Sequence, residues 1–295
     1  DDSLVTTFMR TSADSGRLDS AEYITPSGKF HRFYLTVLDN ETPQNESAPS
    51  LTVITPLNIP QASTFISTDL PDSNIWRAVD VDVNDRSVSP PSSPYAMNFN
   101  GKPNGADSLV LYPTDLRGYE GSGILFSYHY QPQGQGNSPE TDDSLKVEFL
   151  NSAGDWVVVR SYPGTTVQPF LQEVIDLENE PSGSGTFLHS QFQLRISSRG
   201  LPSVFTPNDD WFVDNIYLGL PTGLAVTSVD TVLFDTTQVG STRDASVWLV
   251  NMGFDSLRVS DVLFSNAVFS GSVSSFAMGV GDSVEVVVSF TPTQN

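Results

Sequence analysis

Cysteine is absent from the 295-residue sequence, and Lys and Arg are scarce. The absence of cysteine excludes disulfide scaffolds, thiolate zinc sites and cysteine nucleophiles. Animal extracellular domains usually carry disulfides, so a secreted protein of this composition points to bacteria. No apolar run approaches the ~20 residues of a membrane span, so we expect none. The chain begins Asp1-Asp2 rather than with a signal peptide, and we expect any secretion signal to lie upstream of this numbering.

Positive charge is the second shortage. The sequence holds 14 Lys and Arg against 35 Asp and Glu, a formal net charge of −21. Nucleic acids and anionic lipids bind clustered basic residues, and no such cluster occurs, so we expect neither as a partner. The acids are spread along the chain, which is typical of a solvated acidic surface. The alternative is that some of these carboxylates bind Ca²⁺, a hard cation that prefers oxygen ligands.

Helical periodicity is also nearly absent, and the one short candidate, Phe170 to Leu177, fits a strand equally well. Period-two alternation of apolar and polar residues indicates strands throughout. Leu145 to Leu150 alternates cleanly, and Trp156 to Arg160 follows after the turn Asn151 to Gly154. These two segments predict a hairpin, and the pattern as a whole predicts an all-β fold.

Pro-rich joints divide the chain. Residues 42–50 are rich in Pro, Asn and Ser, and Pro221-Thr222-Gly223 separates two strand-rich stretches. We therefore expect an N-terminal extension at 1–56, a central domain at 57–221 and a C-terminal domain at 223–295. The two larger segments are each long enough to bury a core.

The N-terminal extension contains a hairpin signal. Glu22 to Thr25 and Phe30 to Leu38 flank the turn residues Pro26-Ser27-Gly28. A lone hairpin is marginally stable in water, so this one must pack on a neighbour. The central domain, an upstream domain or another subunit of a homo-oligomer or polymer could supply that surface, and the extension would then be an assembly arm.

The central domain resembles the jelly-roll domains grouped with MAM, reelin-repeat and bacterial cleaved-adhesin or "choice-of-anchor" domains. The matching stretches occur in the family's order over most of the segment: Ser93 to Phe99, Asp107 to Leu116, Gly123 to Tyr128, Asp142 to Phe149 with Gly154-Asp155-Trp156, and the closing strand Asp209 to Leu218. In that strand, alternation predicts two faces: Trp211, Val213, Asn215 and Tyr217 on one, and Phe212, Asp214, Ile216 and Leu218 on the other. Both faces are largely apolar, which indicates a central position in a sheet. The buried carboxylate of Asp214 then requires hydrogen-bond partners.

The C-terminal domain resembles the immunoglobulin-like domains of the ASPM–SPD-2–Hydin and "choice-of-anchor D" type. The matching residues are Val232 to Gly240, Trp248 to Gly253, Ser256 to Val259, Ala267 to Phe269 and Gly281 to Pro292. The resemblance implies a seven-stranded sandwich. Such bacterial domains often precede a sorting domain of the type IX secretion system, which implies an extracellular or cell-surface location.

No catalytic motif is present. His31, His129 and His189 stand apart without metal-type spacing. No nucleophile elbow or phosphate-binding loop occurs, so we expect a protein that is not an enzyme. A carboxylate pair for glycoside hydrolysis stays open as an alternative, because its two members can be distant in sequence.

Five acids are candidate calcium ligands: Asp69, Asp80, Asp82, Asp209 and Asp210. Alternation places Asp80 and Asp82 on one strand face. The central resemblance implies one structural Ca²⁺ where the first and last strands of the jelly roll meet, near Asp210. The spacing is not that of an EF-hand, because Asp85 stands where that loop needs Gly. An exposed acidic loop without metal is the alternative.

Two functions fit the sequence. The first is a non-catalytic extracellular adhesion or structural protein, a subunit of a cell-surface or filamentous assembly held by sandwich contacts and strand pairing. The second is a carbohydrate-binding module of a secreted glycan-degrading protein, in which exposed aromatics stack on sugars. The aromatic candidates are Trp76, Tyr119, Tyr128, Tyr130 and Trp156. Both functions place a cell-surface or glycan ligand on a surface rather than in a catalytic cleft.

Overall fold

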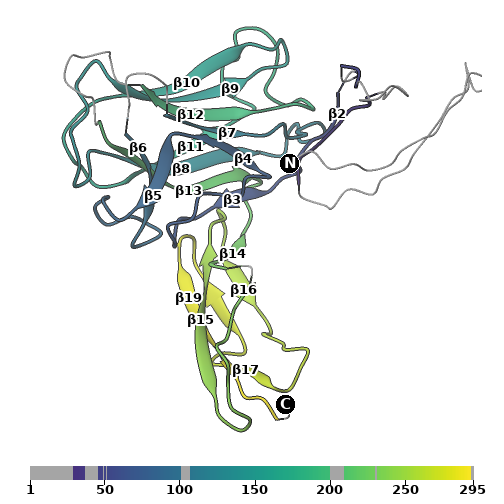
Figure 1. Ribbon diagram of the computed structural model, residues 1–295. Helices are drawn as coiled ribbons and strands as arrows, with labels where there is room; N and C mark the ends of the chain where they lie inside the picture. Colours follow the sequence, from purple (N-terminus) through teal and green to yellow (C-terminus); the bar gives the residue numbers. More distant parts are fainter. Residues whose placement is uncertain are drawn as a thin grey trace, which may run out of the picture. The chain divides into compact units, whose positions relative to one another are not determined.

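The structure, a computed structural model, describes residues 29–36, 46–48, 50, 52–100, 107–199, 209–229 and 231–293. These residues form strands and turns and contain no helix, so none of them forms a helix able to cross a membrane. The chain divides into two compact units, Asp1–Thr55 and Pro56–Asn295. The predicted all-β fold class is confirmed (Figure 1).

The first unit contains one antiparallel strand pair. Strand β1 (His31–Phe33) pairs with β2 (Val53–Thr55), with Arg32 opposite Ile54. The predicted hairpin partner, residues 22–25, and its turn lie outside the described residues. In the described residues, β1 instead pairs with β2, about 20 residues further along the chain. Next to this pair, the backbone N–H of Ser50 donates to the carbonyl of Leu35 at 2.8 Å.

The larger sandwich of the second unit is a jelly roll of two antiparallel sheets (Figure 1). One sheet has the order β10 (Trp156–Pro163), β9 (Ser144–Leu150), β12 (Leu194–Arg199), β7 (Asp107–Leu111) and β4 (Trp76–Val79). The other has the order β11 (Leu171–Asp176), β8 (Leu125–Pro132), β13 (Trp211–Gly219), β6 (Ala96–Phe99) and β5 (Val81–Asn84), and β3 (Gln61–Ser63) also pairs with β13. The ambiguous segment at Phe170 is therefore a strand, and the closing strand is central as predicted.

The core lies between these two sheets. In β9, apolar and polar residues alternate, and the apolar ones point into this core. Leu145, Val147 and Phe149 are fully buried. The Phe149 ring makes edge contacts with Phe126 of the facing sheet at 5.7 Å and with Phe192 at 5.3 Å. Each such side chain stabilises the fold by about 1.5–3 kcal/mol through apolar burial. The predicted hairpin of β9 and β10 is confirmed, with a β-bulge between Val158 and Arg160.

The chain passes from one sheet to the other at Asp80. Strand β4 ends at Val79 in the first sheet, and β5 begins at Val81 in the second. Asp80 has a φ of 55°, in the left-handed region that turns the backbone sharply. The predicted single strand through Asp80 and Asp82 is therefore wrong, because alternation along a continuous strand does not extend across a corner.

Strand β13 contains a second departure from simple alternation. Asp214 lies opposite His129 and Tyr217 opposite Ser127, so β13 has one residue more than β8 over this stretch. Asn215 adopts a left-handed φ of 48° at this bulge. Tyr217 consequently shares a face with Asp214 rather than with Trp211, which corrects the predicted assignment of faces.

The remaining strands form the immunoglobulin-like sandwich. A four-stranded sheet has the order β14 (Ala225–Thr227), β15 (Arg243–Asn251), β19 (Ser283–Phe290) and β17 (Phe269–Gly271), and a pair is formed by β16 (Leu257–Val259) and β18 (Phe276–Met278). Six of the seven expected strands are thus present in the described part of the chain. Asn251 organises the turns: its Nδ2 donates to the Asp255 and Gly279 carbonyls at 2.8 and 3.0 Å.

Candidate functional site

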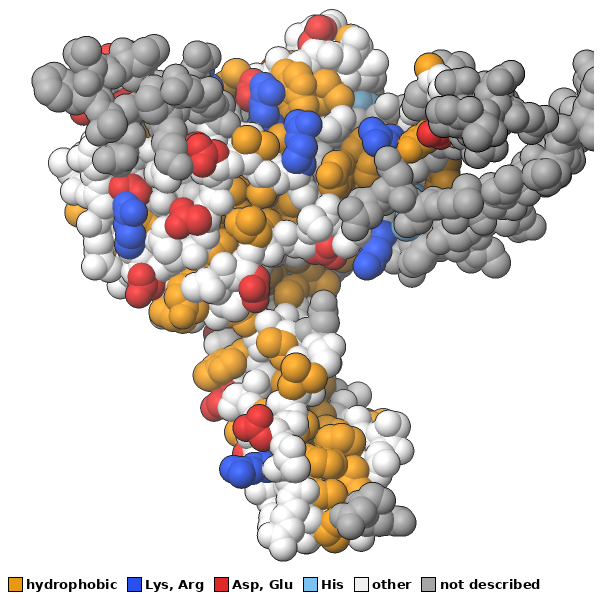
Figure 2. Space-filling view, in the orientation of Figure 1, with side chains coloured by type: hydrophobic (Ala, Val, Ile, Leu, Met, Phe, Trp, Pro, Cys, Tyr) orange, Lys and Arg blue, Asp and Glu red, His pale blue; other side chains and the backbone are white. Residues whose placement is uncertain are grey.

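The outer face of the five-stranded sheet carries an unusual share of the basic residues. Cross-strand register places Arg77, Val110, Arg195 and Glu148 in one row, and Lys146 lies two residues from Glu148 on the same face of β9. Arg77 and Lys146 are exposed. Figure 2 shows Lys and Arg side chains next to hydrophobic ones over the strands of this sheet. The face combines positive charge with apolar area.

Trp156 is the aromatic side chain that the strands of this sheet place on its outer face, where it lies opposite Leu150 of β9. It stands at the start of β10 and is partly exposed. The Arg195 guanidinium lies 4.5 Å from the centroid of its ring. Arg195 Nε in turn donates to Glu148 Oε2 at 2.6 Å. The cation–π contact and the ion pair hold the indole and two planar polar groups in fixed positions before any ligand arrives.

Three of the other predicted stacking aromatics are core residues. Trp76 is buried, and its Nε1 donates to Ser63 Oγ at 3.0 Å. Tyr128 and Tyr130 point between the sheets and are also buried. Burial raises the pKa of both phenols. Tyr119 is partly exposed in a turn. The sequence could not separate these residues from Trp156, because an aromatic in a strand looks the same on either face.

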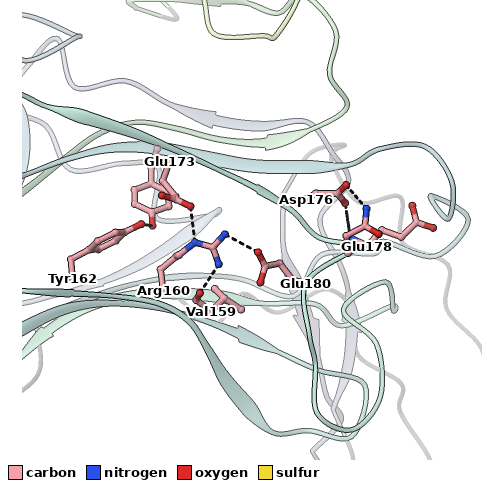
Figure 3. A network of polar contacts seen from close by, with 9 residues as sticks. Val159, Arg160, Tyr162, Glu173, Asp176, Glu178 and Glu180 are labelled. Atoms are coloured by element: carbon pink, nitrogen blue, oxygen red, sulfur yellow. Dashed lines mark hydrogen bonds and ion pairs between the residues drawn. The ribbon is translucent and has the colours of Figure 1, made fainter.

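A polar network closes one edge of the jelly roll, where β10 and β11 lie at the borders of their sheets (Figure 3). Arg160 of β10 donates from Nε to Glu173 Oε1 of β11 at 2.6 Å, and from Nη2 to Glu180 Oε1 at 2.7 Å. Tyr162 stacks on Tyr130 with ring centroids 3.9 Å apart. These contacts join the two sheets, so we assign the cluster a structural role.

An acidic cluster lies at one end of the jelly roll. Glu140 and Asp143 come from the loop between β8 and β9, where the Asp143 N–H donates to the Glu140 carbonyl at 3.0 Å. Asp209 comes from the chain just before β13, where it bridges to Asn137. One carboxylate oxygen from each of the three residues lies within 4.8 Å of the others. In the described part of the chain, this is the one group of three Asp, Glu or His side chains arranged to share a metal ion.

Asp209 is the member of this cluster whose surroundings are least favourable to a charge. It is 2% exposed, and its Oδ2 has no hydrogen-bond partner. Burial, together with the negative charges of Glu140 and Asp143, raises the pKa of Asp209 to about 7. A cation placed among these oxygens would reverse the repulsion.

The structure does not bring the five predicted calcium ligands together. Asp210 has other partners: it forms an ion pair with Arg86 and accepts from Asn98 Nδ2 at 2.9 Å. Asp69 and Asp82 are exposed and accept hydrogen bonds from residues two positions away. Asp80 forms the corner between the sheets. Asp209 alone joins an acidic group, with two residues that sequence reasoning missed.

Asp214 has the partners that its buried position requires. It is fully buried on β13 and accepts from the backbone N–H groups of Ser92 and Asn215 at 2.6 and 2.7 Å. Burial still dominates and raises the pKa of Asp214 to about 7. Among the described residues, no histidine belongs to a metal-binding group, and His189 instead contacts the Leu150 carbonyl at 2.9 Å.

Comparison with known proteins yields similar solved structures only, since no family model and no curated protein matches the sequence. The xylan-binding domain CBM22-1 of Paenibacillus barcinonensis Xyn10C is 14% identical, with a TM-score of 0.33, and covers 54% of this chain and 92% of its own. The tandem CBM22-1–CBM22-2 of that enzyme is 12% identical, with a TM-score of 0.35, over 80% of this chain and 90% of its own. The family 11 carbohydrate-binding module of Clostridium thermocellum Lic26A-Cel5E is 15% identical, with a TM-score of 0.31, over 54% and 95%. Each of these TM-scores is below 0.5, so the likenesses carry no conclusion about the function of this chain.

Proposed function

We propose that this chain is a non-catalytic carbohydrate-binding protein, and that it binds an acidic polysaccharide on the outer face of β10, β9, β12, β7 and β4. The observation that carries the proposal is the partly exposed ring of Trp156, held by Arg195 at 4.5 Å. A polysaccharide ligand implies a location outside the cell, and the absence of cysteine suits a bacterial one.

The chemistry of the face suits a sugar chain. An indole offers a flat apolar surface to the C–H face of a pyranose ring, and its immobilisation costs little entropy because the ring is already fixed. Arg195 and Glu148 are planar groups that can exchange hydrogen bonds with hydroxyls or with a carboxylate. Their ion pair, with the Nε–Oε2 distance of 2.6 Å, sets their orientation in advance.

The positive charge of this face favours an acidic sugar over a neutral one. The chain carries a formal charge of −21, yet this face carries Arg77 on β4, Arg195 on β12 and Lys146 on β9, with Glu148 beside Arg195. Three cations against one carboxylate attract a uronate or sulfate more strongly than a neutral sugar. Because the groups are near the surface, salt should weaken the attraction.

Affinity electrophoresis and titration calorimetry with polygalacturonate, alginate and neutral xylan test the proposal. We expect the acidic polymers to bind more tightly than xylan, and binding to weaken between about 50 and 500 mM NaCl. Trp156→Ala should weaken binding at least tenfold, about 1.4 kcal/mol. Trp248→Ala is the matched control, since Trp248 is 43% exposed on β15 of the other sandwich.

Two results would contradict the proposal. One is a wild-type chain that binds none of these polymers. The other is a folded Trp156→Ala variant that binds as tightly as the wild type. Assembly through the N-terminal extension stays a prediction, and electron microscopy of the native material, with and without residues 1–50, would test it separately.

A further inference from the structure

The acidic cluster of Glu140, Asp143 and Asp209 belongs to neither the binding face nor the core. We propose that these three carboxylates bind one Ca²⁺ ion. The site differs from the one expected from the sequence, because Glu140 and Asp143 replace Asp69, Asp80, Asp82 and Asp210 as partners of Asp209.

The distances fit calcium. Ca²⁺ binds oxygens at about 2.3–2.6 Å, so two oxygens on the same ion lie at most about 5 Å apart. The three carboxylate oxygens lie within 4.8 Å of one another. Mg²⁺ keeps several of its waters and is usually bound through one or two carboxylates, so a group of three carboxylates suits Ca²⁺ better. The group holds no His or Cys, the ligands that zinc prefers.

The unpartnered oxygen of Asp209 is the independent sign of a ligand. Its Oδ2 is buried without a hydrogen-bond donor, on a side chain that is 2% exposed and faces two further carboxyl groups. A buried polar atom without a partner is costly, and a buried charge among like charges is more so. A divalent cation satisfies this oxygen and neutralises most of the cluster at once.

The site lies where it can hold two distant segments together. Glu140 and Asp143 belong to the loop after β8, and Asp209 directly precedes β13, the central strand of its sheet. The loop is itself closely packed, since a Cβ added at Gly164 would lie 1.8 Å from the Glu140 carbonyl oxygen. Bound calcium would therefore stabilise the folded jelly roll without rearranging this part of the loop.

Calcium binding to the full chain tests the proposal. After removal of metal with a chelator and dialysis, calorimetric titration with CaCl₂ should show one site per chain with a Kd of about 1 mM or tighter. Calcium should raise the unfolding temperature, and MgCl₂ at the same concentration should raise it less. Asp209→Asn should weaken calcium binding at least tenfold, whereas Asp82→Asn, which changes an exposed acid on β5, should leave the affinity unchanged.

A second measurement separates ligation from a merely structural role. Without calcium, Asp209→Asn should unfold at a higher temperature than the wild type, because it removes repulsion within the cluster. With saturating calcium the order should reverse. The proposal is overturned if the wild type binds no calcium, if magnesium binds as tightly, if Asp209→Asn keeps wild-type affinity, or if the order of unfolding temperatures does not reverse.

Discussion

Replacing Asp214 with Asn should remove a large part of the pH dependence of stability. The folded-state pKa of Asp214 is about 7, against about 3.9 for an unfolded Asp. The folded protein therefore holds a proton that the unfolded chain releases. Stability linked to this proton is fully present below about pH 4 and is lost as the pH rises to about 7. A shift of roughly three units corresponds to a loss of about 4 kcal/mol.

Urea unfolding from pH 4 to 8, followed by tryptophan fluorescence, measures the effect. The free energy of unfolding of Asp214→Asn minus that of the wild type should increase by up to about 4 kcal/mol between pH 4 and 7, and should then level off. A constant offset of about 1 kcal/mol for a weakened hydrogen bond would not change that slope. Asp82→Asn is the control, because Asp82 lies on β5 of the same sheet as Asp214 but is exposed to solvent. A difference that stays flat with pH would refute the reasoning.

Three stability predictions follow from packing and hydrogen bonding, each measured by denaturant unfolding. Phe149→Ala should cost about 3–5 kcal/mol, because the ring fills the centre of the jelly roll; a loss below 1 kcal/mol would contradict this. Asn251→Ala should cost about 2–4 kcal/mol, because four backbone groups within 3.1 Å of the Asn251 side chain lose their hydrogen-bond partner. An unchanged free energy of unfolding of the C-terminal sandwich would count against this. Gly134→Ala should cost about 1–3 kcal/mol, because φ is +52° and the new Cβ would lie 2.6 Å from Phe212; Gly118→Ala, which meets nothing within 4 Å, separates contact from strain.

Alternation of apolar and polar residues predicted the strands correctly where a strand is regular and one of its faces is exposed to solvent. The pattern from Leu145 to Leu150 predicted β9, its buried face and its hairpin with β10. The same reasoning was wrong at Asp80 and at Asn215, where one residue with a left-handed φ turns or bulges the strand. Neither residue is Gly, so the composition gave no sign of the change.

The candidate sites were harder to predict because they depend on pairs that are distant in sequence. Glu140 and Asp143 are three positions apart in the sequence, and this short spacing was the local sign that the two acids could share a site. Their third member, Asp209, follows 66 residues after Asp143 and was singled out only for its position before the closing strand. Likewise Trp156 was one of five aromatics until the fold placed it on the outer face beside Arg195.

The bulge in β10 also bears on self-association. An edge strand offers unpaired N–H and C=O groups that can template the addition of a foreign strand, the first step of aggregation. At Val159 the extra residue breaks the regular spacing of those groups, and Arg160 Nη1 donates to the Val159 carbonyl at 2.6 Å. The border at β10 is therefore a poor template, and a chain that polymerises by strand addition would have to use another border, such as that of β4 or β5.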